Sequence, residues 1–415
     1  MNIQDFWKCC WLQTRNGLQI RASRGITILC FSSLTFLSVL FFLSSCIEPF
    51  DPVGVQDTAG ILVVEGMILE KGTTIKLSRT IRLDSTLRKA SNSNAVRDAR
   101  VQVIDESKNV IATAEPQFVN GKINPGVYVV NGEISFNSNK KFALDIHIAD
   151  RHYQSAFVAP VHTPAIDDIT WKQNEDESID IMVSTHDPEN RTNYFRWAFV
   201  EDWEYRAWYF GRFVYIPNTS ELVEQSLAGP NNRYYCWDSD ISKTILLGSS
   251  DKHTESAIRN KKIHNFQSKS TRFSYLYSIL VKQYGLDKEA YIYFDNIKKN
   301  IELSGSFFAP QPTELRGNIK CLSHPDEYVI GYIVAATEVV SRIYIDMDKI
   351  HGEDVYNCGE SENFFIYELY NAYLQGWGIC FEFAGMYVCA PIKCVDCLTR
   401  GGTKNKPDFW PNDHQ

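Results

Sequence analysis

The order of hydrophobic and polar residues along the chain predicts a protein built mostly from β-strands. From Ile61 onward, short apolar stretches alternate with polar residues and are separated by turn-forming residues. The stretch ARVQVIDESKNVIATA, for example, places Ala99, Val101 and Val103 on one face of a strand and then continues into a polar turn. Repeats of this pattern predict a first β-sandwich over residues 61–164.

A second β-rich domain is predicted for residues 165–415. The stretch NYFRWAFVEDW directs Phe195, Trp197 and Phe199 to one face of a strand, where we expect them to pack in a core. Near residues 287–303 the apolar residues change to helical spacing, which predicts one helix. The expected fold class is therefore mostly β, with two β-sandwich-like domains, the second with an inserted helix and long loops.

The N-terminal segment has the pattern of an export signal. An apolar run from Ile26 to Leu43 follows four basic residues and ends at LSSC, with two small residues directly before Cys46. This pattern is typical of a bacterial lipobox, in which the cysteine thiol is acylated and the chain is cleaved before it. The alternative is an uncleaved helix, since roughly 20 apolar residues span a bilayer. We expect a lipoprotein signal peptide over residues 1–45, a lipidated Cys46 and a tether over residues 46–60.

The charge balance argues against a nucleic-acid partner. The chain has 42 Lys and Arg against 50 Asp and Glu, and cleavage before Cys46 removes four of the former and one of the latter. The mature chain would then have a net charge of −11, whereas nucleic-acid phosphates need basic patches.

Seven cysteines follow Cys46, and export would place them in a compartment where disulfides form. The pair in CVDC has neither the strand–helix context of a redox motif nor a second pair at zinc-binding spacing, so we expect structural bridges. We predict that Cys236 pairs with Cys321, and that Cys358 pairs with either Cys394 or Cys397. The second bridge would hold the C-terminal tail TRGGTKNKPDFW against the body of the protein.

Other candidate sites for chemistry are few. The sequence contains no nucleophile-elbow, zinc-protease or phosphate-loop motif, so we expect no enzyme activity and no cofactor. His147 and His152 flank a predicted hairpin turn and His162 follows, which makes a surface metal site the alternative to three solvated side chains. Because no ligand-spacing signature supports a metal, we expect none. The polar cluster HDPEN at residues 186–190 is the place to test for hydrolysis, although Asp-Pro favours a turn.

One run of aromatic residues is dense enough for a ligand platform. Aromatic rings stack on sugars and peptides, and exposed rings usually mark a binding surface. The alternative is packing in a core. The candidate ligand-binding residues are Trp203, Tyr205, Trp208, Tyr209 and Phe210.

Several segments of the chain, in this order, resemble one family: CIEPFDP, ILVVEGMI, DPENRTNYFRW, YYCW, GSFFAPQPTELRGNIKC and CVDCLTRGGTKNKPDFW. This family comprises Bacteroidota outer-membrane lipoproteins catalogued as a domain of unknown function, with genes commonly beside a SusC-like TonB-dependent receptor. The first sandwich is similar to the carboxypeptidase-regulatory-like domain, through DARVQV, GVY, FALDI and HYQS. The family has no assigned catalytic residues, so none is carried over.

The resemblance implies a surface-exposed outer-membrane lipoprotein that serves as an accessory binding component of a TonB-dependent nutrient uptake system. The implied partners are the SusC-like β-barrel receptor, the outer membrane through the lipid anchor, and an unknown small nutrient, peptide or glycan. Glu48 and Asp51 resemble the acidic signals that send such lipoproteins to the cell exterior. Two other hypotheses stay open, a surface hydrolase acting on peptide or glycan and a structural envelope assembly factor.

Overall fold

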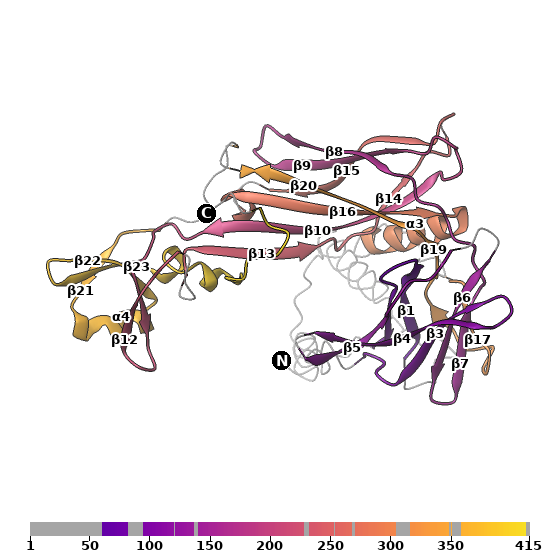
Figure 1. The fold of residues 1–415 in the computed structure, drawn as a ribbon, viewed down its shortest axis with the longest axis horizontal. Helices are drawn as coiled ribbons and strands as arrows, with labels where there is room; N and C mark the ends of the chain where they lie inside the picture. Colours follow the sequence, from indigo (N-terminus) through magenta and orange to yellow (C-terminus); the bar gives the residue numbers. More distant parts are fainter. Residues whose placement is uncertain are drawn as a thin grey trace, which may run out of the picture. The chain divides into compact units, whose positions relative to one another are not determined.

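The structure of the protein is a computed structural model that describes residues 60–81, 94–119, 121–136, 140–227, 232–252, 254–267, 270–303, 316–347, 350 and 358–411. Within these residues the protein is mostly β, as the sequence predicts (Figure 1). The predicted signal peptide, the candidate lipidation site Cys46 and the tether as far as residue 59 lie outside the described residues. Among the described helices, none is long and apolar enough to cross a membrane.

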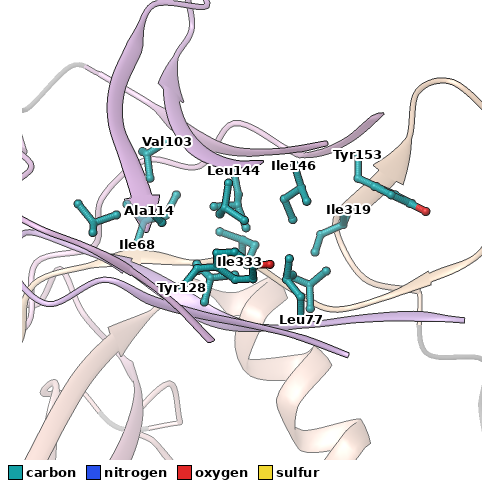
Figure 2. Packing of buried hydrophobic residues seen from close by; sticks show 14 of the residues in the cluster. Ile68, Leu77, Val103, Ala114, Tyr128, Leu144, Ile146, Tyr153, Ile319 and Ile333 are labelled. Carbon is teal, nitrogen blue, oxygen red and sulfur yellow. The ribbon is translucent and has the colours of Figure 1, made fainter. Parts of the chain in front are cut away.

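The first sandwich is built from one ten-stranded sheet. Its strands are β1 (Leu62–Leu69), β2 (Thr74–Arg79), β3 (Ala99–Asp105), β4 (Val110–Val119), β5 (Lys122–Val130), β6 (Phe142–Ile148), β7 (Arg151–Ser155), β17 (Ile319–Cys321), β18 (Val329–Ile330) and β19 (Ala335–Ala336). The order is β17-β7-β6-β3-β4-β5-β2-β1-β18, and β19 also pairs with β1. Figure 2 shows Leu144 and Ile146 of one layer pointing toward Leu77 and Tyr128 of the other, so the core lies between the two layers.

The first sandwich is not formed by residues 61–164 alone, which corrects the predicted domain boundary. Strand β17 pairs with β7, and β18 and β19 pair with β1, so residues 319–336 complete the sheet from a distant part of the chain. Ile319 and Ile333 from this segment lie in the core. Strands of two or three residues have too little alternation to be recognised in a sequence.

The second sandwich consists of a five-stranded and a three-stranded sheet. Its strands are β8 (Ile166–Gln173), β9 (Ile179–His186), β10 (Tyr194–Arg206), β13 (Tyr235–Ile241), β14 (Leu246–Ser249), β15 (Ala257–Phe266), β16 (Leu276–Leu286) and β20 (Glu338–Asp346). The order β13-β10-β16-β20, with β14 on β10, faces the order β15-β9-β8 (Figure 1). Phe195, Trp197 and Phe199 are buried between the sheets, which confirms the predicted core face of β10.

Helix α3 (Lys288–Leu303) confirms the helix predicted near residues 287–303. Asp287 begins it, because its Oδ1 accepts a hydrogen bond from the Ala290 backbone N–H at 2.6 Å. Ala290 and Phe294 are buried in a cluster with Met67 of β1, so the helix packs against both β10–β16 and the first sandwich.

A third group of elements, here called the C-terminal module, comprises residues 213–224 and 362–400. Its strands are β11 (Phe213–Ile216), β12 (Glu221–Glu224), β21 (Glu362–Phe364), β22 (Trp377–Phe383) and β23 (Met386–Pro391). Helix α4 (Leu369–Leu374) and the three short 3₁₀ helices Ile366–Glu368, Ile392–Cys394 and Cys397–Arg400 connect them. Strands β11 and β12 form a hairpin, and the remaining strands form a sheet in the order β21-β23-β22. A small core of Leu369, Ile379, Tyr387 and Cys389 holds the module together.

Two disulfides join Cys236 to Cys397 and Cys358 to Cys394. The predicted pairing of Cys236 with Cys321 is wrong, because Cys321 lies on β17 in the core of the first sandwich, whereas Cys236 lies in the core of the second. The pairing of Cys358 with Cys394 is one of the two predicted alternatives and is confirmed. Both cysteines of CVDC therefore serve as structural bridges at the end of the C-terminal module.

Candidate functional site

The aromatic run predicted as a ligand platform divides into a buried and an exposed part. Trp203 and Tyr205 face the core of the second sandwich and are 4% and 1% exposed. The Tyr205 hydroxyl donates a hydrogen bond to the carbonyl oxygen of Cys397 at 3.0 Å. These two residues therefore stabilise the sandwich and are not available to a ligand, which corrects this part of the prediction. Alternation along β10 explains their burial, since both point to the same face as Trp197.

The other three residues of the run are exposed and lie where the chain enters the C-terminal module. Trp208, Tyr209 and Phe210 are 51%, 38% and 43% exposed. The Tyr209 backbone N–H donates to the carbonyl oxygen of Cys394 at 2.9 Å, which fixes this segment to the module. Gly211 follows, and a Cβ there would lie 2.5 Å from Val395 Cγ1, so only glycine permits this close approach.

The C-terminal module itself exposes further large apolar side chains, which the sequence analysis did not single out. Large apolar patches on the surface of soluble proteins mark binding sites, so these side chains are candidates for contact with a ligand or partner. Together with Trp208, Tyr209 and Phe210 they make up what we call the aromatic surface. These further members are Phe365, Ile366, Tyr367, Tyr370, Leu374, Phe381 and Phe383.

A cavity of about 140 Å³, here called the Trp377 cavity, lies within the module. Its walls are largely apolar, and they include the aromatic side chains of Phe213, Tyr215, Tyr373 and Trp377. A second hollow of about 340 Å³ adjoins it, because Tyr215 lines both, and Tyr367 and Tyr370 of the aromatic surface line the second. The two hollows together form a partly open, aromatic-lined site with the composition usual for a ligand pocket.

Polar groups in the Trp377 cavity lack partners among the described residues. Gln225 is 5% exposed, and its Nε2 has no hydrogen-bond acceptor. The Nε of Arg233 also has none, since the nearest carboxylate oxygen, Oδ2 of Asp396, is 3.9 Å away. Burial raises the pKa of Asp396, although the Leu398 backbone N–H and Arg233 oppose this. Gln225, Arg233 and Asp396 thus place an amide, a guanidinium group and a carboxyl group in the wall of the cavity.

The second sandwich contains a buried ionic cluster next to Trp203. Glu201 is 2% exposed and accepts hydrogen bonds from Arg272 Nε at 2.9 Å and from the Tyr277 hydroxyl at 2.8 Å. Burial alone would raise the pKa of Glu201, but His264 and Arg272 lower it to about 2. The Arg272 guanidinium also lies over the Trp203 ring, with its Cζ 4.1 Å from the ring centroid. All these groups have partners, so the cluster has a structural role in holding β15 and the 271–273 turn on β10.

The HDPEN cluster at residues 186–190, the candidate hydrolytic site, forms a turn after β9. Asp187 is 4% exposed, and its carboxylate accepts backbone hydrogen bonds from Glu189, Arg191 and Thr192 at 2.8 to 3.0 Å. Burial would raise the pKa of Asp187, yet these backbone N–H groups lower it. A carboxylate engaged in this way shapes the loop, as the Asp-Pro sequence predicts.

The histidines near the β6–β7 turn do not behave as three separate solvated side chains. The rings of His147 and His152 stack with their centroids 4.1 Å apart, and both contact the carboxylate of Asp145. His162 lies outside this group, in the segment after β7, where its carbonyl oxygen accepts a hydrogen bond from Thr192 Oγ1. The sequence indicates that His147 and His152 flank the hairpin turn. It does not indicate that both imidazoles contact the carboxylate of Asp145.

Comparison with known proteins gives a family but no activity. No curated protein matches the chain. Among solved structures, a crystal structure of bovine butyrophilin is similar at 8% sequence identity, covers 53% of this chain and 87% of that chain, and has a TM-score of 0.16, which is too low to support any argument. The family model described as "Domain of unknown function (DUF4249)" matches residues 47–342, whereas strands β21, β22 and β23 lie beyond the matched residues. With well over half of its residues matched, the chain belongs to the DUF4249 family.

Proposed function

We propose that the protein is a lipid-anchored binding protein of the outer membrane, facing the cell exterior, that captures a nutrient for a SusC-like TonB-dependent receptor. The observation that carries the binding role is the Trp377 cavity, which is lined by aromatic, aliphatic and a few polar side chains and is bordered by the aromatic surface. The lipobox-like LSSC and the family resemblance support the location and the receptor partner.

The chemistry of the cavity indicates the class of ligand. Gln225 and Arg233 line the cavity and both side chains carry hydrogen-bond donors, so we expect a bound molecule with acceptor oxygens. Aromatic walls stack on flat or apolar faces of sugars and peptides. Peptides and oligosaccharides combine acceptor oxygens with such faces.

A binding experiment tests the role of the site. The full-length protein in detergent is dialysed to equilibrium against a tryptic peptide digest and, separately, against maltodextrin oligosaccharides, and the retained molecules are identified by mass spectrometry. We expect retention of one class by the wild type and at least a tenfold weaker retention by the Tyr367→Ser/Tyr370→Ser double variant. Phe118→Ser is the matched control, because the exposure of Phe118, 65%, lies between those of Tyr370 and Tyr367, 50% and 75%, but Phe118 lies on β4 of the first sandwich. Equal retention by all three proteins would place binding elsewhere.

A second experiment tests location and partner. Affinity purification of the full-length protein after mild detergent extraction, from cells that express the neighbouring receptor, should recover that β-barrel. External protease should degrade the protein on intact cells. Isolation of the protein alone, or its protection from external protease, would contradict this part of the proposal.

A further inference from the structure

We infer that the β6–β7 hairpin binds a divalent metal ion of the zinc type through Asp145, His147 and His152. This site shares no residue with the Trp377 cavity. A test of metal binding is therefore independent of a test of nutrient binding. The ligand atoms of the three side chains all lie within 4.8 Å of one another.

The backbone of the hairpin places these side chains together. A two-residue loop joins β6 to β7 and fixes their register, with His147 opposite His152 and Asp145 opposite Gln154. Side chains alternate along a strand. Leu144 points into the core in Figure 2, so Asp145 and His147 share the opposite face of the sheet, together with His152.

The geometry of the three side chains is close to that of a metal site. His147 Nε2 lies 3.0 Å from Asp145 Oδ2, and His152 Nε2 lies 2.6 Å from Asp145 Oδ1. The two rings are nearly parallel, at 10°, so both Nε2 atoms face the same carboxylate. Ligands bound to one zinc ion at about 2.0 to 2.2 Å are roughly 3.3 Å from one another in a tetrahedron. The three ligand atoms, which lie within 4.8 Å of one another, are therefore near this spacing.

The charge of the site favours a cation. Asp145 is 8% exposed, and its carboxylate contacts the two imidazoles and the Gln154 amide, whose Nε2 donates at 3.2 Å. Within the described part of the chain, no lysine or arginine forms an ion pair with it. A nearly buried carboxylate needs a compensating positive charge, and a metal ion between the imidazoles and the carboxylate supplies it. The Gln154 amide then orients the carboxylate from outside the ligand set.

The chemical types of the three ligand groups indicate which metal ion the site would bind. Two imidazoles and one carboxylate suit zinc and its neighbours, whereas calcium and magnesium take oxygen ligands. The side chains of His147 and His152 are about one-third exposed, at 33% and 32%, so an ion can enter and water can complete its coordination.

A neighbouring group of Cys321, His324 and Glu327 serves as the internal comparison. Its donor atoms also lie within 4.8 Å of one another. The Glu327 carboxylate, however, is already engaged, since it accepts a hydrogen bond from the Tyr153 hydroxyl at 2.6 Å and forms an ion pair with Arg151. We therefore place the metal at the β6–β7 hairpin and not here.

Calorimetric titration of the chelator-treated, untagged full-length protein with zinc chloride tests the inference. We expect one zinc ion per chain, no binding of calcium, and at least a tenfold loss of zinc affinity in both His147→Gln and His152→Gln. His324→Gln should bind zinc as the wild type does. Because both histidines are partly exposed, circular dichroism should show that the variants fold. Absence of equimolar zinc binding, unchanged affinity in both hairpin variants, or loss of binding in His324→Gln would overturn the assignment.

Discussion

Glu204 is a buried carboxyl group whose replacement by glutamine should stabilise the protein at alkaline pH. It lies on β10, is 2% exposed, and accepts a hydrogen bond from the Trp410 indole N–H at 2.6 Å. The surrounding cluster of Trp237, Leu276 and Trp410 is apolar. Burial raises the pKa of Glu204 to about 7, and Trp410 and the positive charge of Lys406 oppose this only in part.

The size of the effect follows from the difference between the folded and unfolded pKa values. The unfolded chain has a glutamate pKa of 4.5, so the folded protein holds the proton more tightly. The stability that Glu204 contributes is therefore fully present below pH 4.5 and is lost as the pH rises through about 7. At about 1.4 kcal/mol for each pKa unit, the ionised carboxyl costs roughly 3 kcal/mol above that pH. Glutamine keeps an acceptor for Trp410 and does not ionise.

Urea unfolding of the full-length protein at pH 5 and pH 8, followed by tryptophan fluorescence, measures this difference. We expect the free energy of unfolding of Glu204→Gln, relative to the wild type, to increase by roughly 2.5 kcal/mol between the two pH values. A difference that stays constant or decreases would refute the reasoning, because it would mean that Glu204 ionises in the fold as it does in the unfolded chain.

Glu201 provides the matched control, since it lies three residues earlier on the same strand and is equally buried. Its carboxylate is paired with Arg272, and its pKa is lowered to about 2, so it is ionised throughout this pH range. Glu201→Gln breaks a buried ion pair and should destabilise the protein at pH 8 by roughly 3 to 5 kcal/mol, opposite in sign to Glu204→Gln.

Three further predictions concern the bridges, the turn and the cavity. Replacement of Cys236 and Cys397 by serine opens a loop with a sequence separation of 161 and should lower the free energy of unfolding by up to about 5 kcal/mol, measured by urea unfolding against Cys380→Ala as a control outside the bridges. Asp187→Ala should destabilise by about 2 to 3 kcal/mol through the loss of its backbone hydrogen bonds, and an unchanged melting temperature would argue against a turn role. Gln225→Leu should raise the unfolding free energy by about 1 kcal/mol while weakening ligand retention, and weakened stability would show that the amide is already satisfied.

Much of the fold follows from patterns that are local in the sequence. The buried face of Phe195, Trp197 and Phe199 and the helix α3 were predictable because alternation and helical spacing act over a few residues. The completion of the first sandwich by β17 to β19 was not predictable, since these strands are short and their partners lie far away along the chain. This long-range pairing also explains the wrong partner for Cys236, because it places Cys321 in a different core.

The candidate site was predictable only in part. Aromatic density identified Trp208, Tyr209 and Phe210, but the same criterion included the buried Trp203 and Tyr205, since alternation alone does not say which face another sheet covers. The exposed side chains of residues 365–383 have the composition of a core, and only the packing shows that no described layer covers them. The walls of the Trp377 cavity come from residues 213–233 and 373–396, and the convergence of two such distant segments has no signal in a single sequence.

Growth under nutrient limitation tests the central claim most directly, that the C-terminal module captures a nutrient at the cell surface. A strain that lacks the protein should grow more slowly on one limiting peptide or glycan source, and the wild-type chain and Phe118→Ser should restore growth. The Tyr367→Ser/Tyr370→Ser variant, present in the outer membrane at the wild-type level, should not. Unchanged growth of the deletion strain on every such source, with a disturbed envelope, would contradict the claim and favour an assembly role.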